Sequence, residues 1–143
     1  MILGLGSDIC DIRRIEKAIA RHGDRFLERV FTEQERAEAG KRAPKIRPST
    51  YAKRFAAKEA GAKALGTGFV GGVFFSNLEV VNLRGGKPTL VLTDGSAERL
   101  ASLVPAGMAA QVDLTMTDEY PYAFAQVIIS AVPTQRAVPA PRP

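Results

Sequence analysis

The sequence has few of the residues that stabilise secreted domains or build metal clusters. Its 143 residues include one cysteine, one histidine and no tryptophan. Cys10 has no disulfide partner and no companion thiol for zinc, which favours a reducing compartment over secretion. The histidine, His22, stands beside Gly23 at the end of a predicted helix, so we expect it to be solvated or to face the helix dipole.

Long apolar runs are also absent. The N-terminus starts apolar, but no basic region precedes it, and Asp8 interrupts it before a signal-peptide core would be complete. No later stretch reaches the roughly 18 uninterrupted apolar residues that a membrane span needs. Because 45% of the residues are hydrophobic, as in an ordinary globular chain, the sequence predicts one compact cytoplasmic domain without a membrane partner.

Basic residues are concentrated in one segment. Residues 13–54 hold 13 of the 20 basic residues and 6 of the 15 acidic ones, so this segment carries +7 and the remainder of the chain −2. A basic face on an otherwise neutral domain favours an acidic partner. Nucleic acid, a membrane surface and an acidic protein are all compatible with the charge alone.

Helices are predicted mainly in the first half of the chain. From Ile12, apolar residues recur at helical spacing beside a basic stripe, with Asp11 as the cap and Gly23 as the stop. A short helix follows over residues 24–31. The sequence TEQE at residues 32–35 then has the form of a capping box, which predicts the start of a third helix.

The longest predicted helix follows a loop at residues 43–48. Ser49 or Thr50 is its expected cap, and its Ala-rich sequence runs to about Leu65, before a Gly-Thr-Gly turn at residues 66–68. Later in the chain, Asp94 is expected to cap a short helix to about residue 104.

Strands are predicted at the N-terminus and in the second half, at residues 2–9, 75–83, 89–93, 111–117 and 122–132. Residues 84–88 have the composition of a hairpin turn. The strand at 111–117 places Val112, Leu114 and Met116 on one face, and we expect it to pair with the last strand in antiparallel fashion. This order of helices and strands favours the α+β class over alternating βαβ units. We place the domain at residues 1–132 and expect a Pro-rich mobile tail at 133–143.

Three charged residues stand where apolar residues would be expected. Glu59 and Lys63 are four apart and share a face of the long helix, which is ordinarily a surface ion pair, but their neighbours are small and apolar. Asp8 ends an apolar strand, where it either caps a local turn or belongs to a site. If the strand end faces the long helix, Asp8 and Glu59 form a two-carboxylate site suited to Mg²⁺, and Lys63 meets a phosphate.

These residues resemble a known family, the holo-acyl-carrier-protein synthases, which are small single-domain 4′-phosphopantetheinyl transferases. The likeness covers the chain to about residue 132. It rests on GLGSDI at residues 4–9 with Arg14 and Ile15, on RFAAKEA at residues 54–60 with Lys63, on Gly-Thr-Gly at 66–68, and on Gly-Lys-Pro at 86–88.

The resemblance implies the fold, an antiparallel sheet packed with a long central helix, and the reaction. Such enzymes transfer the phosphopantetheine arm of coenzyme A to a serine of apo acyl carrier protein with Mg²⁺, and release adenosine 3′,5′-bisphosphate. Asp8 and Glu59 match the metal ligands. Glu59, directly or through a metal-bound water, would remove the serine proton, and Lys63 would hold the pyrophosphate and stabilise or protonate the leaving phosphate.

The resemblance also implies how the substrates bind. The family forms homotrimers with active sites between subunits, and the neighbouring subunit would contribute Lys87, Pro88 and Thr117. The residues expected to contact coenzyme A are Arg54, Lys63, Gly66, Lys87, Pro88 and Thr117. The residues expected to dock the acidic carrier protein are Arg13, Arg14, Lys17 and Arg21. One departure is that Met116 follows Thr115 where many members have a histidine, so no imidazole is available there.

Two alternatives belong to other functional classes. A small basic RNA-binding module would also explain the net charge of +5, but it predicts aromatic residues interleaved with the basic ones for base stacking. The aromatics of residues 13–54 are few and also suit a core: they are Phe26, Phe31 and Tyr51. A non-catalytic oligomeric binding protein would not need Asp8, Glu59 and Lys63 together. We therefore expect an enzyme that does not bind nucleic acid.

Overall fold

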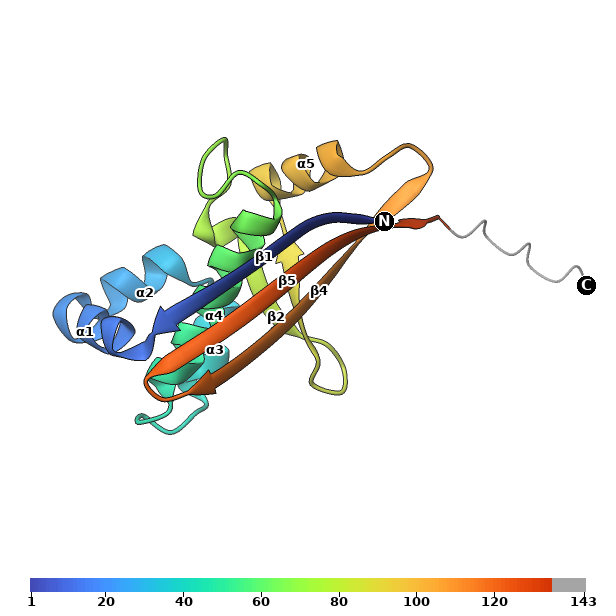
Figure 1. Cartoon of the computed structure of the whole chain (residues 1–143). Helices are drawn as coiled ribbons and strands as arrows, with labels where there is room; N and C mark the ends of the chain where they lie inside the picture. The colour runs from blue at the N-terminus through green and yellow to red at the C-terminus, as the bar shows by residue number, and fades with distance from the viewer. Residues whose placement is uncertain (135–143) are drawn as a thin grey trace, which may run out of the picture.

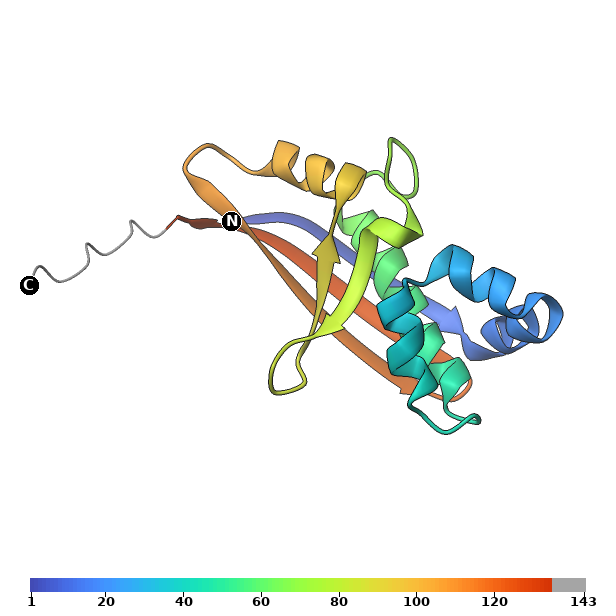
Figure 2. The ribbon, with the colours of Figure 1, turned by 180° about the vertical axis from the view of Figure 1, so that it is seen from behind.

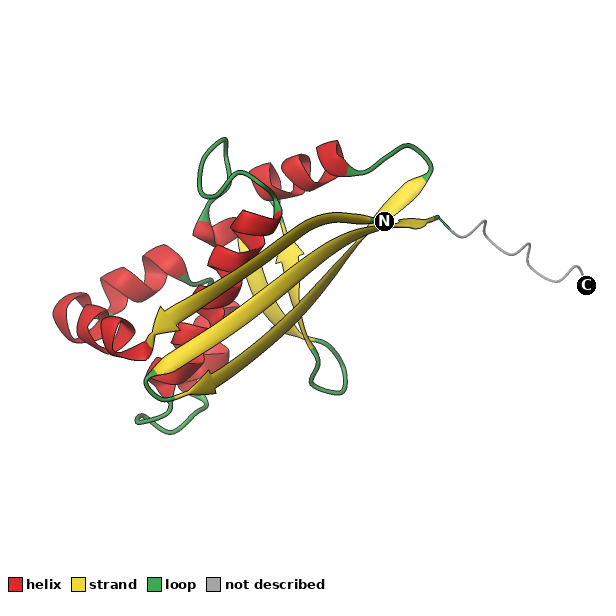
Figure 3. Ribbon diagram, viewed as in Figure 1, coloured by secondary structure: helices red, strands yellow, loops and turns green. Residues whose placement is uncertain are grey.

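A computed structural model describes residues 1–134 of the chain as an α+β fold (Figures 1 and 3). Three long strands form one antiparallel sheet in the order β1-β5-β4, and β2 and β3 form a separate antiparallel hairpin. The strands are β1 (Ile2–Asp11), β2 (Leu78–Asn82), β3 (Pro88–Leu92), β4 (Met108–Glu119) and β5 (Tyr122–Pro133). The helices are α1 (Ile12–His22), α2 (Asp24–Val30), α3 (Glu33–Gly40), α4 (Arg47–Ala64) and α5 (Asp94–Leu103), with the short 3₁₀ helix η1 at Phe75–Asn77.

The long helix α4 occupies the centre of the molecule. It packs against β1 and β5 on one side and reaches the β2–β3 hairpin on the other, as the two opposite views show (Figures 1 and 2). A Cβ at Gly61 would lie 2.9 Å from a methyl of Leu90 in that hairpin. The small residues of α4 therefore let both layers approach the helix closely.

Two glycines bring β1 onto α4 almost backbone to backbone. A Cβ at Gly4 would lie 1.9 Å from the carbonyl oxygen of Ala64, and a Cβ at Gly6 would lie 1.9 Å from that of Ala60. Neither contact leaves space for a side chain. Side chains alternate along a strand, so Asp8 follows Gly4 and Gly6 on the same face, directed at the helix.

The three-stranded sheet has one covered and one uncovered face. Alternate residues of β5 that face α4 are buried, namely Ala123, Ala125, Val127, Ile129 and Ala131. On the opposite face, Leu5, Ile9 and Tyr122 are 59%, 66% and 51% exposed. Met116 faces α4 together with Leu114 and packs against the core, which confirms the predicted apolar face of β4.

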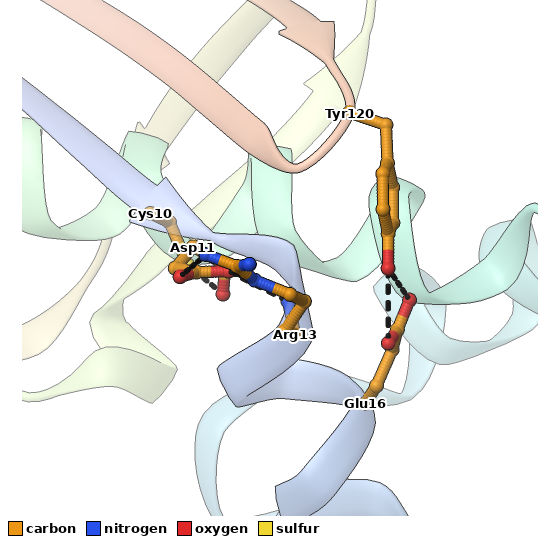
Figure 4. Close-up of polar contacts among 5 residues, drawn as sticks. All are labelled: Cys10, Asp11, Arg13, Glu16 and Tyr120. Atoms are coloured by element: carbon orange, nitrogen blue, oxygen red, sulfur yellow. Dashed lines mark hydrogen bonds and ion pairs between the residues drawn. The ribbon is translucent and has the colours of Figure 1, made fainter.

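The start of α1 is pinned between its own cap and the β4–β5 turn. Asp11 accepts a hydrogen bond from the Arg13 amide at 3.0 Å, and the Ile12 amide donates to the carbonyl of Pro121 at 2.7 Å. The Tyr120 hydroxyl donates to Glu16 at 3.2 Å, as Figure 4 shows. The predicted cap at Asp11 is thereby confirmed.

The predicted start of the long helix at Ser49 or Thr50 is wrong. Helix α4 begins at Arg47, with Pro48 in its first turn. Proline has no amide hydrogen and a fixed φ, so it suits the first helical turn better than the loop to which it was assigned. The hydroxyls of Ser49 and Thr50 donate to the carbonyl of Ile46 at 2.8 and 3.2 Å instead of accepting from helix amides.

The cap predicted at Asp94 is also wrong. Thr93 occupies the N-cap position, and Asp94 is the first helical residue, with a φ of 47°. Its carboxylate accepts a hydrogen bond from the side-chain amide of Asn77 at 3.3 Å. The Asp94 side chain therefore links α5 to η1 and does not cap the first turn of α5.

The strand predicted from residue 75 begins only at Leu78, because Phe75–Asn77 form the 3₁₀ helix η1. Further predictions concern the ends of the chain. Strand β5 runs to Pro133, one residue beyond the predicted domain limit. The greater part of the predicted tail, residues 135–143, lies outside the described residues. Within residues 1–134, no helix combines the length and the apolar character that crossing a membrane requires.

Candidate active site

Strand β1 and helix α4 bring Asp8 and Lys63 into contact. The Lys63 Nζ donates to Asp8 Oδ1 at 3.1 Å and to the carbonyl of Ser7 at 2.9 Å. The Asp8 side chain is 18% exposed and that of Lys63 is 51% exposed, so the pair lies at the edge of the buried β1–α4 contact and opens to solvent. Asp8 therefore faces the long helix, as a two-carboxylate site requires.

Glu59 stands one helical turn before Lys63 on the same face of α4. Its side chain is half-buried, and burial together with the negative charge of Asp8 raises the pKa of Glu59 above its ordinary value. The positive charges of Lys63 and Arg14 oppose this rise in the pKa. Two carboxylates and two cations thus share one electrostatic environment.

The proximity of Arg14 to Glu59 was not predicted, because the sequence pattern places Arg14 only on a docking helix. Strand β1 ends at Asp11, which is also the N-cap of α1. The first turn of α1 therefore begins beside the Asp8–Glu59 pair. No spacing rule in the sequence reports this, since the position depends on the direction in which α1 leaves the strand.

The donor set fits a magnesium ion. Mg²⁺ binds oxygen ligands and usually keeps several waters, with one or two carboxylates from the protein and the rest from substrate phosphates. Asp8 and Glu59 supply two carboxylates whose mutual repulsion a cation would relieve. Residues 1–134 contain no group of three or more potential His, Cys, Asp or Glu ligands, so the remaining ligands would be water or substrate oxygens.

The Gly-Thr-Gly turn follows this site directly. The Gly66 amide donates to the carbonyl of Lys63 at 3.0 Å, and Gly66 and Gly68 both have positive φ, at 78° and 61°. The Arg99 guanidinium of α5 donates to the carbonyl of Leu65 at 2.9 Å. The end of α4 is therefore held from two sides, with Gly66 exposed next to Lys63.

Arg54 lies on another side of α4. Nine residues separate it from Lys63, which corresponds to about half a turn around the helix and about 13 Å along it. The Arg54 side chain is buried, and its Nε has no hydrogen-bond partner among the described residues. It lines a cavity of about 100 Å³ with Gln34 and Glu38, and burial lowers the pKa of its guanidinium.

The three residues assigned to a neighbouring subunit lie away from Asp8 within one chain. Lys87 and Pro88 belong to the β2–β3 hairpin, where the Lys87 Nζ lies 3.4 Å from Asp113 Oδ1. Thr117 pairs with Phe124 of β5, which pairs with Ile9 on its other side, whereas Asp8 pairs with Ala125, the partner of Met116. Thr117 and Asp8 therefore face opposite sides of the sheet.

Of the four basic residues of α1 expected to dock the carrier, only Arg13 forms an ion pair among the described residues. The Arg13 guanidinium forms two bonds to Asp11, at 2.9 and 2.8 Å, which lower the pKa of that carboxyl (Figure 4). Arg14, Lys17 and Arg21 are exposed, and no salt bridge within residues 1–134 includes them. They share one face of the helix.

Comparison with known proteins identifies the family of this chain. The family model of the 4'-phosphopantetheinyl transferase superfamily matches residues 4–125. The chain is 70% identical over 133 residues to the holo-[acyl-carrier-protein] synthase of Granulibacter bethesdensis, covering 93% of this chain and 92% of that protein.

Solved structures agree with the fold. The holo-[acyl-carrier-protein] synthase of Neisseria meningitidis superposes with a TM-score of 0.79 at 35% identity, covering 91% of this chain and 99% of that one. The Bacillus anthracis synthase, in complex with CoA (3',5'-ADP), superposes with a TM-score of 0.71 at 36% identity, covering 90% and 96%. The predicted family resemblance and the α+β class are both confirmed.

Proposed function

The chain belongs to the 4'-phosphopantetheinyl transferase superfamily, and we propose that it is a holo-[acyl-carrier-protein] synthase that uses Mg²⁺. It transfers the phosphopantetheine arm of coenzyme A to a serine of apo acyl carrier protein and releases adenosine 3′,5′-bisphosphate. The observation that carries this proposal is the meeting of Asp8, Glu59 and Lys63 at one solvent-accessible edge of the β1–α4 contact.

Asp8 and Glu59 would hold the metal, which supplies positive charge to the pyrophosphate oxygens as negative charge develops on them. Glu59 takes the proton of the attacking serine hydroxyl. Burial and the charge of Asp8 raise the pKa of Glu59 above its ordinary value, so before a metal binds its carboxylate is a stronger base than that of an ordinary glutamate. The serine oxygen forms its bond to the phosphorus that bears the pantetheine, and the bond from that phosphorus to the bridging oxygen breaks.

Lys63 would stabilise the leaving phosphate. Its stem reaches from α4 to the end of β1, so the same ammonium that now contacts Asp8 can turn to a phosphate oxygen bound beside it. An ammonium aimed at developing negative charge is worth most where water is partly excluded, as at this half-buried site. Gly66, exposed directly beyond Lys63, would let the pantetheine or phosphate approach the backbone.

Arg54 would serve a different part of coenzyme A from Lys63. The two lie on opposite sides of α4, so they cannot contact one phosphate together. Coenzyme A carries a 3′-phosphate as well as its pyrophosphate. The buried guanidinium with a free Nε beside a cavity suits the anionic group remote from the reaction.

We infer that the active unit is a homotrimer. Thr117 lies on the uncovered face of the sheet, which also carries exposed Leu5 and Ile9 and a cavity of about 570 Å³ lined by Thr117, Ile9, Tyr122 and Phe124. Apolar surface of this kind is typical of an interface. Packing this face against further copies would bring Thr117, Lys87 and Pro88 of one chain toward Asp8 of another.

The carrier protein would dock on α1. Arg14, Lys17 and Arg21 form an exposed basic face next to Glu59, which suits an acidic helix that presents the serine. Arg13 contributes less, because Asp11 already holds its guanidinium. We place the reaction in the cytoplasm, which agrees with a lone cysteine that is buried and whose thiol pKa burial raises to about 11.

The test is direct transfer. The protein is mixed with coenzyme A, Mg²⁺ and an apo acyl carrier protein, and the carrier is weighed by mass spectrometry. We expect the mass of one phosphopantetheine to be added, and we expect Asp8→Asn to abolish this gain while its circular dichroism matches the wild type. If the carrier gains no mass where a control transferase modifies it, the proposed function is wrong.

A further inference from the structure

A buried ion pair lies beside the candidate active site without being part of it. The Lys58 Nζ lies 2.6 Å from Glu35 Oε1, and both side chains are 0% exposed. Lys58 immediately precedes Glu59 in α4, and Glu35 belongs to α3. Neither side chain has a role in the chemistry proposed above, and the sequence pattern assigned Glu35 only to a capping box.

Every donor of the Lys58 ammonium is occupied. Besides Glu35, it donates to the carbonyl of Phe75 at 2.9 Å and to that of Leu78 at 2.8 Å. Three donors with three fixed acceptors define the position of the Nζ in space. Lys58 therefore joins α4 to η1 and to the start of β2 as well as to α3.

The Glu35 carboxylate is equally well bonded. Its Oε1 accepts from the Thr32 amide at 2.9 Å, which completes the capping box, and its Oε2 accepts from the Val80 amide at 3.0 Å. Backbone amides at the start of α3 and in β2 thus hold the carboxylate in place independently of Lys58.

Stability alone is a weak reason for this arrangement. Burial lowers the pKa of Lys58, and the charge and hydrogen bond of Glu35, followed by the charge of Glu79, oppose that shift. Two ions removed from water lose hydration energy that their attraction barely offsets, and well-packed apolar residues of similar size are often as stable. Unlike apolar contacts, hydrogen bonds are directional, so they define one orientation of the elements that they join.

Helix α4 has few long side chains that interlock with its neighbours, chiefly Tyr51 against Phe31 and Phe55 stacked on Phe75, so the directional bonds of Lys58 help to define its orientation. Its other buried residues are mostly alanine and glycine: Ala52, Ala56, Ala57, Ala60, Gly61, Ala62 and Ala64. Interlocking of long side chains normally sets how one element is rotated against another. Against β1, α4 presents bare backbone to Gly4 and Gly6, so no interlocking side chain sets the rotation of the helix at this contact.

We propose that Lys58 and Glu35 are positioning residues, which fix the rotation of α4 so that Glu59 faces Asp8. Consecutive helical residues are about 100° apart, so an Nζ held at three points sets the direction of the next side chain. The inference rests on the proposed function, because it assumes that Glu59 acts together with Asp8.

The test measures metal binding and turnover in the full-length protein. Mn²⁺ is the probe, titrated by calorimetry, and transfer to the carrier gives kcat and the KM for coenzyme A. We expect Lys58→Met to weaken Mn²⁺ binding and lower kcat by about 10- to 100-fold each, the usual cost of losing a group that orients a metal ligand. The KM for coenzyme A should rise as well, because Lys63 and Arg54 lie on the same helix and turn with it.

The control is a variant of equal stability. Ile129 is buried in β5 on the other side of α4, and Ile129→Val or Ile129→Ala is chosen to match the measured loss in free energy of unfolding. At a temperature where both variants are folded, the control should keep wild-type kcat and Mn²⁺ affinity. If Lys58→Met keeps them too, the pair serves stability only and the proposal is overturned.

A second variant, Glu35→Gln, tests the proposal if Lys58→Met folds poorly. Glu35→Gln keeps the size of the side chain but removes its charge and places an amide donor against the Thr32 or Val80 amide. It should lower kcat and Mn²⁺ affinity in the same direction, and wild-type values would overturn the proposal.

Failure of the proposed function has a different signature. In that case the wild type itself neither binds Mn²⁺ nor modifies the carrier, and crystal structures of the wild type and Glu35→Gln decide the positioning role alone. Glu59 turned away from Asp8 in the variant supports the role, and an unchanged Glu59 overturns it.

Discussion

The Lys63 ammonium lies 3.1 Å from Asp8 Oδ1, although 55 residues separate the two in the chain. This contact closes β1 onto α4 at the point where Glu59 also stands. It places a cation beside two carboxylates, so the site is electrostatically balanced before a metal binds. A divalent metal and Lys63 would then compete for Asp8.

The competition can be measured. In Lys63→Met, the carboxylates lose a neighbouring positive charge, so we expect Mn²⁺ to bind more tightly than in the wild type. Transfer to the carrier should still fall by at least about 100-fold, because the leaving phosphate loses its cation. The matched control is Lys53→Met on the same helix, which breaks a 2.9 Å pair with Asp118 of β4. A weaker affinity for Mn²⁺ in Lys63→Met would contradict the arrangement.

Glu59 should make the protein less stable at neutral pH. Burial and the charge of Asp8 raise the pKa of Glu59 above 4.5 in the folded state. The folded chain therefore binds this proton more tightly than the unfolded chain. Protonation of Glu59 therefore contributes fully to stability below pH 4.5, and this contribution is lost as the pH rises through the raised pKa of Glu59.

Glu59→Gln removes this titration. We expect its Tm to exceed that of the wild type at pH 7 without divalent metal, and the difference to vanish below about pH 4.5. Thermal denaturation from pH 4 to pH 8 measures it. The exposed carboxylate of Glu98 on α5 supplies the control variant, Glu98→Gln, which should show no gain at pH 7. A Tm difference that stays constant with pH would contradict the electrostatic origin.

Gly6 should not tolerate even a methyl group. A Cβ there would meet the Ala60 carbonyl oxygen at 1.9 Å, and neither backbone can move without separating β1 from α4. We expect Gly6→Ala to cost about 1–3 kcal/mol or more in free energy of unfolding, measured by urea denaturation, and to lower transfer because Asp8 moves with β1. Gly40→Ala is the control, since a Cβ at Gly40 meets nothing within 4 Å.

Arg14 and Arg13 should differ in carrier binding. Arg14 is exposed without an ion pair among the described residues, whereas Asp11 holds the Arg13 guanidinium. We expect Arg14→Glu to raise the KM for the carrier about tenfold with little change in the KM for coenzyme A, and the effect to shrink at high salt. Arg13→Gln should change the carrier KM much less. Equal effects of Arg14→Glu on both substrates would speak against docking on α1.

The uncovered sheet face should set the oligomeric state. Leu5 of β1 is 59% exposed on this face, and Leu5→Asp places a charge on it. We expect the wild type to run at about three times the chain mass of 15.4 kDa in light scattering, and Leu5→Asp to shift toward the single chain. Val91→Asp, an exposed apolar position on the hairpin, is the control. A wild type that stays at 15.4 kDa would remove the basis for a shared active site.

Much of the local structure follows from residues close together in sequence. Asp11 and Gly23 bound α1, Thr32 and Glu35 form the capping box, and the glycines at 85 and 86 turn the β2–β3 hairpin. The i, i+4 spacing of Glu59 and Lys63 also sets their common face before any folding is considered. These features depend on hydrogen bonds and dihedral preferences that span a few residues, so the pattern of residues is sufficient to predict them.

Contacts between distant segments were decided by the tertiary structure. In the sequence, Asp8 is a carboxylate at the end of an apolar strand, and Arg54 belongs to the same motif as Glu59. Only the packing of β1 on α4 brings Asp8 to Lys63, and only the packing of other elements around α4 buries Arg54 beside Gln34 and Glu38. Glu35 is a capping residue by local criteria, yet its carboxylate also receives Lys58 and the Val80 amide from elsewhere in the fold. Local bonds are set by neighbours along the chain, whereas these contacts exist only once the whole core has packed.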